Sequence, residues 1–356
     1  MFGNFFVGKN VFITGHTGFK GSWLSLWLNK LGAKVVGYAL KPPTDPNFFD
    51  VCHLSDKMIS ILGDIRDGKN LSFCLQKYQP EIVFHLAAQP LVRESYKNPV
   101  DTYDVNIMGT VHLLEACRYV ESIKTIVNIT SDKCYENIEQ EKRYSEEDRL
   151  GGRDPYSSSK ACCELVTKAY VHSFLQSKIF VASARAGNVI GGGDWAQDRL
   201  LPDTIKSIMQ GKEVVIRNPD AIRPWQHVLE PLCGYLILAK KLYESGAFFS
   251  GGWNFGPEKE SEKKVRYIMD YLINKWQKGA SWKIDDNIHP YEAKFLSLDN
   301  SKSKMLLGWE PRWNLEEALS YTIEWYGAYY STRKDMQDFS LYQIEQYEKE
   351  MCYANM

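Results

Sequence analysis

Residues 10–23 read NVFITGHTGFKGSW, and no other stretch of the chain says as much about the fold. The apolar run at 10–14 is typical of a buried strand, and Gly15, Gly18 and Gly21 follow it at the start of a helix-length segment. Glycines allow a tight turn, and a helix N-terminus offers free N–H groups and the positive end of the helix dipole. The segment therefore predicts a strand–turn–helix unit that can hold a pyrophosphate.

The rest of the first half repeats this alternation of apolar runs and helix-length segments, which indicates an α/β fold with a doubly wound parallel sheet. We expect strands at 10–15, 34–39, 58–62, 82–86, 125–130 and 179–184, and helices at 18–31, 69–78, 101–119 and 156–174. Further on, we expect a helix at 229–243, a short strand at 252–255 that returns to the sheet, and helices at 262–278 and 315–329.

Beyond Arg185 the chain becomes rich in glycine and proline, as in GNVIGGGDW and RNPDAIRPW, which is typical of loops that contact a ligand. This change predicts a Rossmann domain followed by a smaller C-terminal α/β domain that binds the substrate. The Rossmann domain is expected to comprise 1–185, with 224–256 and about 287–308 returning to it, and the smaller domain 186–223, 257–286 and 309–356.

Composition excludes several classes of protein. A formal net charge of −1, with acidic and basic residues interspersed, provides no attraction for nucleic acid or for an anionic membrane surface. No apolar run reaches the ~18 residues of a membrane span and the first residues lack a signal-peptide pattern, so we expect a cytosolic protein. The eight cysteines show no Cys-x-x-Cys spacing, which indicates neither disulfides nor a zinc site, and Cys134 is expected to pack beside the active site.

Tyr156 and Lys160 stand four residues apart at the start of a predicted helix, so their side chains share one face. A free tyrosine, with a pKa near ~10, is not a base at neutral pH, but a neighbouring ammonium and a positively charged nicotinamide stabilise its phenolate. The pair predicts a base that removes a hydroxyl proton while hydride leaves the same carbon. An exposed helical pair without catalytic function is the alternative that this spacing alone leaves open.

Ser131, Asp132 and Lys133 directly follow the predicted strand at 125–130. Ligands of open parallel sheets bind at the carboxyl ends of the strands, so these three side chains are expected to face a substrate. A carboxyl and an amine held side by side can serve as acid and base. A solvated turn with an ordinary charge pair is the alternative.

The segments HTGFKGSW, HLAAQPLVR, TSDKCY, DPYSSSK, RAGNVIGGGDWA and RPWQHV resemble those of the sugar-nucleotide 4,6-dehydratases, which are extended short-chain dehydrogenases. The resemblance runs from about residue 9 to about residue 313. It implies NAD as the cofactor, oxidation at carbon 4 of the sugar, loss of water across carbons 5 and 6, and hydride return to carbon 6. Lys133, where relatives that use dTDP- or GDP-sugars have glutamate, is similar to the branch of the family that uses CDP-glucose.

The resemblance also assigns roles to residues. Ser131 is expected to bind the 4-oxygen, Asp132 to protonate the leaving hydroxyl and Lys133 to take the hydrogen from carbon 5, alongside Tyr156 and Lys160. The expected cofactor contacts are Gly15, His16, Thr17, Gly18, Phe19, Lys20, Gly21, Asp64, Ile65, Leu86, Ala87, Ala88, Gln89, Asn106, Thr130, Tyr156 and Lys160. The expected substrate contacts are Gln89, Ser131, Arg185, Asn188, Arg199, Arg217, Arg223 and His227. No metal is expected, and the helices that begin near 101 and 156 are expected to form a homodimer or homotetramer.

Several alternatives remain open at this point. The second predicted strand ends in VVGYALKPP without the acidic residue that often binds the ribose of NAD, and Lys41 keeps NADP possible. Asp64 could simply cap the next helix. A sugar-nucleotide 4-epimerase or decarboxylase would share the fold and the Tyr156/Lys160 pair but needs no acid–base pair beside Ser131. A non-catalytic dinucleotide sensor on this scaffold would not need Tyr156 and Lys160.

Overall fold

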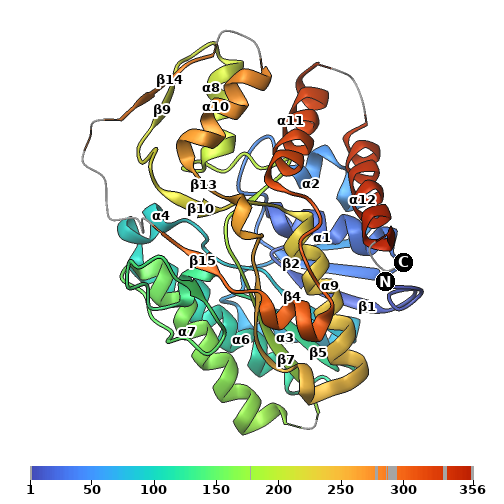
Figure 1. The fold of residues 1–356 in the computed structure, drawn as a ribbon. Coiled ribbons are helices and arrows are strands. Elements are labelled where there is room, and N and C mark those ends of the chain that lie inside the picture. The colour runs from blue at the N-terminus through green and yellow to red at the C-terminus, as the bar shows by residue number, and fades with distance from the viewer. Residues whose placement is uncertain are drawn as a thin grey trace.

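Seven parallel strands form the central sheet of the computed structural model, in the order β12-β7-β5-β4-β1-β2-β3 (Figure 1). The structure describes residues 2–176, 178–276, 280–285, 287, 295–331 and 335–353. The strands of this sheet are β1 (Asn10–Thr14), β2 (Lys34–Ala39), β3 (Ile59–Leu62), β4 (Ile82–His85), β5 (Thr125–Ile129), β7 (Phe180–Ala186) and β12 (Gly251–Phe255). The predicted doubly wound fold is confirmed, and β12 returns to the sheet beside β7 as predicted.

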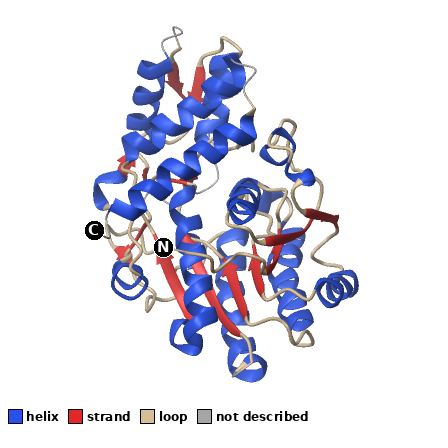
Figure 2. Ribbon diagram, turned by 90° about the vertical axis from the view of Figure 1, so that its right-hand side faces the viewer, coloured by secondary structure: helices blue, strands red, loops and turns tan. Residues whose placement is uncertain are grey.

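Helices cover both faces of the sheet (Figure 2). They are α1 (Phe19–Lys30), α3 (Gly68–Tyr78), α5 (Pro99–Tyr103), α6 (Gly109–Cys117), α7 (Pro155–Tyr170) and α9 (Leu229–Ser245). Along β1, Val11 and Ile13 belong to one hydrophobic cluster with α1 and α9, whereas Phe12 belongs to a second cluster with α3 and α6. This alternation follows from the period of two along a strand, which sends successive side chains to opposite faces.

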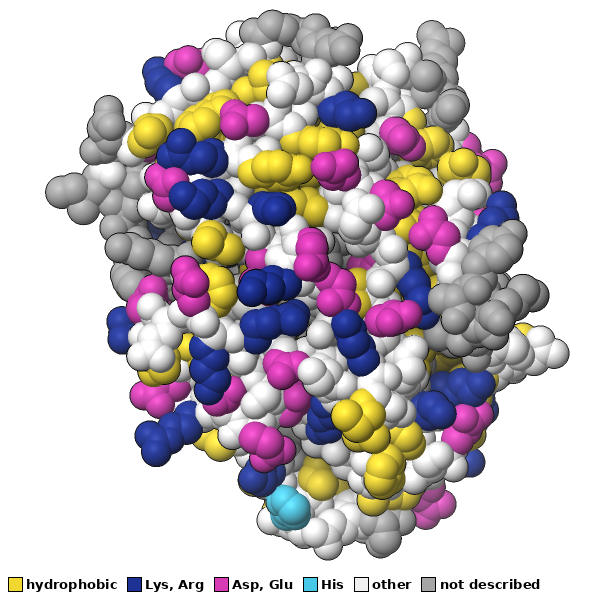
Figure 3. Space-filling model, in the orientation of Figure 1, with side chains coloured by type: hydrophobic (Ala, Val, Ile, Leu, Met, Phe, Trp, Pro, Cys, Tyr) yellow, Lys and Arg dark blue, Asp and Glu magenta, His cyan; other side chains and the backbone are white. Residues whose placement is uncertain are grey.

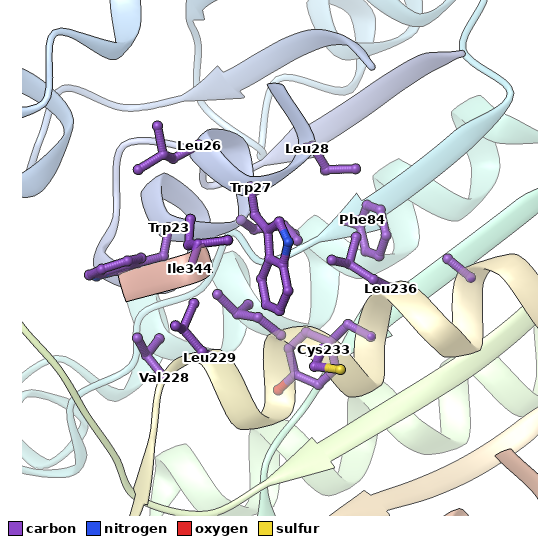
Figure 4. Packing of buried hydrophobic residues seen from close by; sticks show 14 of the residues in the cluster. Trp23, Leu26, Trp27, Leu28, Phe84, Val228, Leu229, Cys233, Leu236 and Ile344 are labelled. Atoms are coloured by element: carbon purple, nitrogen blue, oxygen red, sulfur yellow. The ribbon is translucent and has the colours of Figure 1, made fainter. Parts of the chain in front are cut away.

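Aromatic side chains of α1 lie within the larger cluster. Trp23 and Trp27 lie against Leu229 and Cys233 of α9, and Ile344 of the last helix lies nearby (Figure 4). All of these side chains are buried. The packing fixes α1, and therefore the glycine turn that precedes it, on the sheet.

A smaller group of elements lies above the sheet in Figure 1. It contains α8 (Leu200–Met209), α10 (Val265–Trp276), the parallel strands β9 (Val214–Ile216) and β14 (Trp282–Ile284), and the antiparallel strands β10 (Ile222–Pro224) and β13 (Glu262–Lys264). Besides short 3-10 and π-helical turns, the other elements are α2 (Phe48–Val51), α4 (Val92–Lys97), α11 (Leu315–Ser331), α12 (Met336–Tyr353), and the short paired strands β6 (Arg143–Tyr144), β15 (Ser297–Leu298), β8 (Val189–Ile190) and β11 (Gln226–His227).

Several helices differ from the sequence predictions. The helix predicted for 156–174 ends at Tyr170 and continues as a π-helical turn at Val171–Leu175. A π-helical turn at Asp104–Met108 interrupts the helix predicted for 101–119. The helix predicted for 262–278 starts only at Val265, because Glu262–Lys264 pair with β10; residues 277 and 278 lie outside the described residues. Helices α2, α4, α8 and α12 were not predicted. Helical periodicity does not reveal a strand whose partner lies about 40 residues away in sequence, as Arg223 and Lys263 do.

Helix α12 packs on α1, where Glu348 accepts hydrogen bonds from Trp27 Nε1 and Lys30 Nζ, both at 2.7 Å. The C-terminal segment, assigned above to the smaller domain, thus also contacts the Rossmann helices. The proposed domain boundaries stay a prediction.

No helix in the described part of the chain is long and apolar enough to cross a bilayer. Basic and acidic side chains are interspersed on the face shown in Figure 3.

Glu230 of α9 joins this helix to the C-terminal segment. Its carboxyl is fully buried and accepts hydrogen bonds from the backbone N–H groups of Arg312 and Trp313 and from the hydroxyl of Tyr347 at 2.6 Å. Burial raises the pKa of this carboxyl to about 7, although these donors lower it. The folded chain therefore retains a proton that the unfolded chain releases above the ordinary value of 4.5. The contribution of Glu230 to the free energy of unfolding falls as pH rises from about 4.5 to about 7.

We predict that Glu230→Gln removes this pH dependence and keeps the packing, because an amide can accept from the backbone and donate to Tyr347. Glu230→Ala leaves the donors unsatisfied and is expected to lower the free energy of unfolding by at least about 3 kcal/mol. Thermal unfolding of both variants between pH 5 and 8 tests this. Glu244→Gln, at the exposed end of the same helix, is the control and should behave as the wild type.

Candidate active site

A cavity of about 900 Å³ opens at the carboxyl ends of the parallel strands, between the sheet and the smaller group of elements. The glycine turn after β1 lines one part of it, the segments after β4 and β5 line the middle, and α8 and β9 line the far part. The topology of the sheet explains the location of the cavity, because the parallel strands all end at one edge of the sheet and leave a crevice there.

The glycine turn has the shape that a dinucleotide requires. Gly15 has a φ of +77° and a Cβ there would lie 2.7 Å from Ala87 N, while a Cβ on Gly21 would lie 2.1 Å from Gly15 O. These two glycines let the strand, the turn and α1 pack closely. A Cβ on Gly18 would meet only Gly15 O, at 3.4 Å, so this position faces open space at the start of α1. The backbone here fits a pyrophosphate, which the helix N-terminus attracts.

Asp64 lies in the part of the cavity where the adenosine of a dinucleotide is expected to bind, and its carboxylate already has a partner within the chain. Asp64 lines the cavity, but its carboxylate is bound by Arg66 at 2.6 Å, and Arg66 also reaches Asp101 at 2.7 Å. Arg66 lowers the pKa of Asp64. The Oδ1 atom of Asp64 also accepts a hydrogen bond from the backbone N–H of Arg66. The residue that caps the N-terminus of α3 is Asp67. The capping alternative is therefore not what the structure shows for Asp64. Lys41 also lines the cavity.

Tyr156 and Lys160 both lie on the buried face of α7 and line the cavity. Asp154 caps the N-terminus of this helix, and its side chain accepts the backbone N–H of Ser157 at 2.9 Å. Burial raises the pKa of Tyr156, while a hydrogen bond with Ser131 and the charge of Arg199 lower it. Burial lowers the pKa of Lys160. The exposed-pair alternative is therefore wrong, and Tyr156 is a phenol unless its surroundings gain positive charge.

Ser131, Asp132 and Lys133 form a tight turn directly beneath Tyr156. Ser131 Oγ donates to Asp132 Oδ1 at 2.9 Å and accepts the backbone N–H of Lys133 at 3.2 Å. Asp132 is buried, and its Oδ2 is left without a hydrogen-bond partner in the described structure. A buried, unpartnered carboxylate oxygen is aimed at something that the chain itself does not supply.

Lys20 brings a second ammonium to this region from the first turn of α1. Burial lowers the pKa of Lys20 to about 8, with the charge of Arg199 acting in the same direction and Asp132 opposing it. The Nζ atom lies 6.0 Å from the ring centroid of Tyr235. Lys20, Lys160 and Arg199 bring positive charge to this end of the cavity, and of the three the charge of Arg199 lowers the pKa of Tyr156 against the effects of burial and of Asp132.

Most of the predicted site residues come together in this cavity. The five catalytic candidates line it, as do Gly15, Thr17, Gly18, Phe19, Lys20, Gly21, Asp64, Ile65, Leu86, Ala87, Ala88, Thr130, Asn188, Arg199, Arg217 and Arg223. The predicted residues that do not line it are His16, Gln89, Asn106, Arg185 and His227.

Arg185 differs most clearly from its predicted role. Its guanidinium makes a two-pronged ion pair with Glu164 of α7, with Nε and Nη2 each 2.9 Å from a carboxylate oxygen, and it also donates to Tyr135 at 2.8 Å. The Arg185 and Glu164 side chains are only 5% and 4% exposed. Arg185 therefore joins β7 to α7 behind the cavity instead of contacting a ligand.

The other four residues support neighbouring parts of the site. The Gln89 side chain is bound to Thr102 and to the backbone of Leu91, and Asn106 holds the backbone of Gln89 and the hydroxyl of Ser159. His16 Nε2 is 2.7 Å from Ser60 Oγ, so the ring packs under the glycine turn. Burial lowers the pKa of His227 to about 3, which leaves a neutral ring that accepts from the backbone of Leu229.

Sequence reasoning missed Arg93. Arg93 of α4 and Arg217 both donate to Asp198 Oδ1, each at 3.0 Å, and all three residues line the cavity. Asp198 has a φ of +60°, an uncommon conformation for a residue other than glycine. The segment HLAAQPLVR contains Arg93, but its sequence position gives no sign that it meets Arg217.

The glycine cradle, the buried tyrosine–lysine pair and the crevice together define a dinucleotide-dependent enzyme on a Rossmann fold. The family model described as GDP-mannose 4,6 dehydratase matches residues 12–322, and the chain belongs to this family. It is 55% identical over 332 residues to the CDP-glucose 4,6-dehydratase of Salmonella typhimurium, covering 92% of both chains. It is 26% identical to the dTDP-glucose 4,6-dehydratase of Xanthomonas campestris over 88% of this chain and 92% of that one.

Solved structures share the fold. The UDP-glucose 4-epimerase of Thermotoga maritima superposes with a TM-score of 0.77 at 23% identity, covering 89% of this chain and 98% of that chain. The dTDP-glucose 4,6-dehydratase of Bacillus anthracis, in a complex with NAD, has a TM-score of 0.75 at 22% identity, covering 90% and 96%. At these identities the likeness establishes the architecture alone.

Proposed function

We propose that this chain converts CDP-glucose into CDP-4-keto-6-deoxyglucose and water, as an NAD-dependent hydro-lyase. The observation that carries this proposal is the meeting of Ser131, Asp132 and Lys133 with Tyr156 and Lys160 in one buried cavity. The identity of 55% with a CDP-glucose 4,6-dehydratase over most of both chains supports the nucleotide and the sugar. The product belongs to the class of 4-keto-6-deoxy sugars from which the deoxysugars of polysaccharides are made.

The glycine turn and α1 would hold the pyrophosphate of NAD, and the segments after β3 and β4 would hold its adenosine and nicotinamide ends. Bound NAD would supply the site that takes the hydride from carbon 4 and returns it to carbon 6. Tyr156 removes the proton of the 4-hydroxyl, and Ser131 binds the same oxygen. Arg199 supplies positive charge that lowers the pKa of Tyr156, and Lys160 and Lys20 line the same cavity, where their ammonium groups would act in the same direction.

Asp132 and Lys133 carry out the elimination. Once carbon 4 is a ketone, the hydrogen on carbon 5 is acidic, and the neutral amine of Lys133 removes it. Asp132 protonates the departing 6-hydroxyl, for which its unpartnered Oδ2 is in place. Lys133 then returns a proton to carbon 5.

Arginines from both parts of the molecule would bind the diphosphate of the substrate. Arg217 and Arg223 line the far part of the cavity, as expected from the sequence, and Arg93 faces Arg217 across Asp198. Guanidinium groups match phosphate oxygens in a two-pronged geometry. A diphosphate that binds here would replace Asp198 as the partner of Arg93 and Arg217.

A sugar-nucleotide 4-epimerase or decarboxylase remains the second candidate, since a 4-epimerase shares the fold. The presence of Asp132 and Lys133 within the cavity favours dehydration, because those reactions need no acid and base for elimination. A non-catalytic sensor is disfavoured by the buried Tyr156 and Lys160.

Incubation with CDP-glucose and NAD tests the proposal directly. We expect a product that absorbs near-ultraviolet light in alkali, without accumulation of reduced cofactor in proportion to product. Parallel incubations with dTDP-, UDP- and GDP-glucose and with NADP test the nucleotide and cofactor. Stoichiometric reduction of NAD, or an epimerised product, would show a different reaction.

We further propose that the enzyme is a homodimer or homotetramer built through α5, α6 and α7. Val100 of α5, Met108 of the π-helical turn before α6 and Leu165 of α7 are 80%, 42% and 55% exposed, and Tyr103 of α5 forms a 2.8 Å hydrogen bond with Ser158 of α7. A second copy would cover these apolar side chains.

A cytoplasmic location is also part of the proposal, supported by the free thiols of the seven described cysteines.

A further inference from the structure

Asp198 lies at the point where two arginines from different parts of the molecule meet. Arg93 of α4 and Arg217, which directly follows β9, each place an Nη1 atom 3.0 Å from Asp198 Oδ1. All three residues line the cavity. One carboxylate oxygen is therefore held between two guanidinium groups, one from the segment after β4 and one from the segment after β9.

The carboxylate of Asp198 presents these arginines with the same kind of group that a phosphate would present. Burial raises the pKa of Asp198, but the hydrogen bonds and charges of Arg93 and Arg217 outweigh burial and hold this pKa below its ordinary value, so the group is an anion at neutral pH. Asp198 gives both guanidinium groups a single oxygen to share. A diphosphate can give each of them its own pair of oxygens, and is therefore the better partner.

The Asp198 side chain can leave the arginines without disturbing the fold. It is 36% exposed, so the carboxylate can turn into water, and ion pairs that reach solvent are weak. The next residue, Arg199, stands at the N-cap of α8 and is held separately by Asp194 at 2.8 Å. The start of α8 therefore does not depend on the two ion pairs of Asp198.

We propose, on the basis of the diphosphate site in the proposed function, that Asp198 is a built-in competitor of the substrate. Before the substrate binds, the carboxylate stands where a phosphate group will stand, and it leaves when the diphosphate arrives. Only molecules in which Asp198 has released the arginines can bind, so the apparent dissociation constant is the intrinsic one divided by the fraction of such molecules. The product carries the same diphosphate, so Asp198 lowers the affinity for the product by the same factor and promotes its release.

Titration calorimetry of wild type and Asp198→Asn with CDP and with cytidine, in the presence of NAD, tests this role. Asparagine has the shape of aspartate and also tolerates the φ of +60° at this position, but it has no negative charge with which to hold the arginines. We expect Asp198→Asn to bind CDP about 10-fold more tightly, as for a wild type in which roughly one molecule in ten has released the arginines. Cytidine has no phosphate and should bind both proteins equally. The Michaelis constant for CDP-glucose should fall, and CDP should become a stronger inhibitor.

Glu213→Gln is the matched control for a general effect of charge. Glu213 also lines the cavity, directly before β9, but it is paired with Lys283 at 3.1 Å, so the substitution removes one negative charge and frees neither arginine. This variant should bind CDP as the wild type does.

Two results would overturn the competitor and leave the proposed function intact. Unchanged or weaker binding of CDP by Asp198→Asn would show that Asp198 positions the arginines for the ligand. Equal tightening in Glu213→Gln, or equal tightening of cytidine in Asp198→Asn, would show that no competition for the phosphate site is involved. Absence of CDP binding by all three proteins, each shown to be folded by thermal unfolding, would instead refute the CDP-sugar substrate and with it this role of Asp198.

Discussion

Lys133→Met is expected to abolish dehydration while leaving oxidation at carbon 4 possible. Loss of a general base lowers such rates by about 10²- to 10⁴-fold, and methionine has nearly the length of lysine but no basic nitrogen. The variant should form reduced cofactor and the 4-keto form of the unchanged hexose when it is mixed with CDP-glucose. In deuterated water, it should incorporate no deuterium at carbon 5. Rapid absorbance measurement and mass spectrometry of the recovered sugar check the two steps.

Two further variants make this result specific. Lys57→Met removes an exposed lysine outside the cavity and should turn over as the wild type does. Asp132→Asn lacks the acid but keeps Lys133, so it should still exchange the hydrogen on carbon 5 while it releases little water. Wild-type exchange in Lys133→Met would show that another group, such as Lys20, is the base.

The sequence predicted those parts of the site that depend on short-range order. The glycine turn lies directly after β1, Ser131–Lys133 directly after β5, and the pair Tyr156 and Lys160 on one face of α7, because strand ends and helix faces follow from local periodicity. The same local patterns gave the order of strands and helices in the Rossmann domain. All five catalytic candidates line the cavity for this reason.

Predictions failed where a side chain is paired with a residue far along the chain. Nothing near Arg185 indicates that Glu164 lies opposite it, and nothing near Arg93 indicates that Asp198 and Arg217 complete its cluster. The family resemblance placed Arg185 among the substrate contacts, but adjacent residues of a strand point to opposite faces, and the Arg185 side chain lies on the face of β7 where Glu164 meets it. The helix α12 was missed because its apolar residues are not gathered strongly on one helical face, and its burial depends on contacts with α1 and α9.

Arg185→Met is expected to destabilise the fold by about 3–5 kcal/mol, because it leaves the Glu164 carboxylate buried without its charged partner. Glu164→Gln should also destabilise, since the guanidinium then lies buried beside a neutral amide. The double variant Arg185→Met/Glu164→Leu should recover much of the loss, because well-packed apolar side chains can replace a buried ion pair. Arg118→Met, which removes a partly exposed ion pair with Glu115, should change stability much less. Urea unfolding measures the stability of all four variants, and the Michaelis constant for CDP-glucose shows whether Arg185 contacts the substrate. A large rise of this constant in Arg185→Met with unchanged stability would support the predicted substrate contact and contradict the structural role of Arg185.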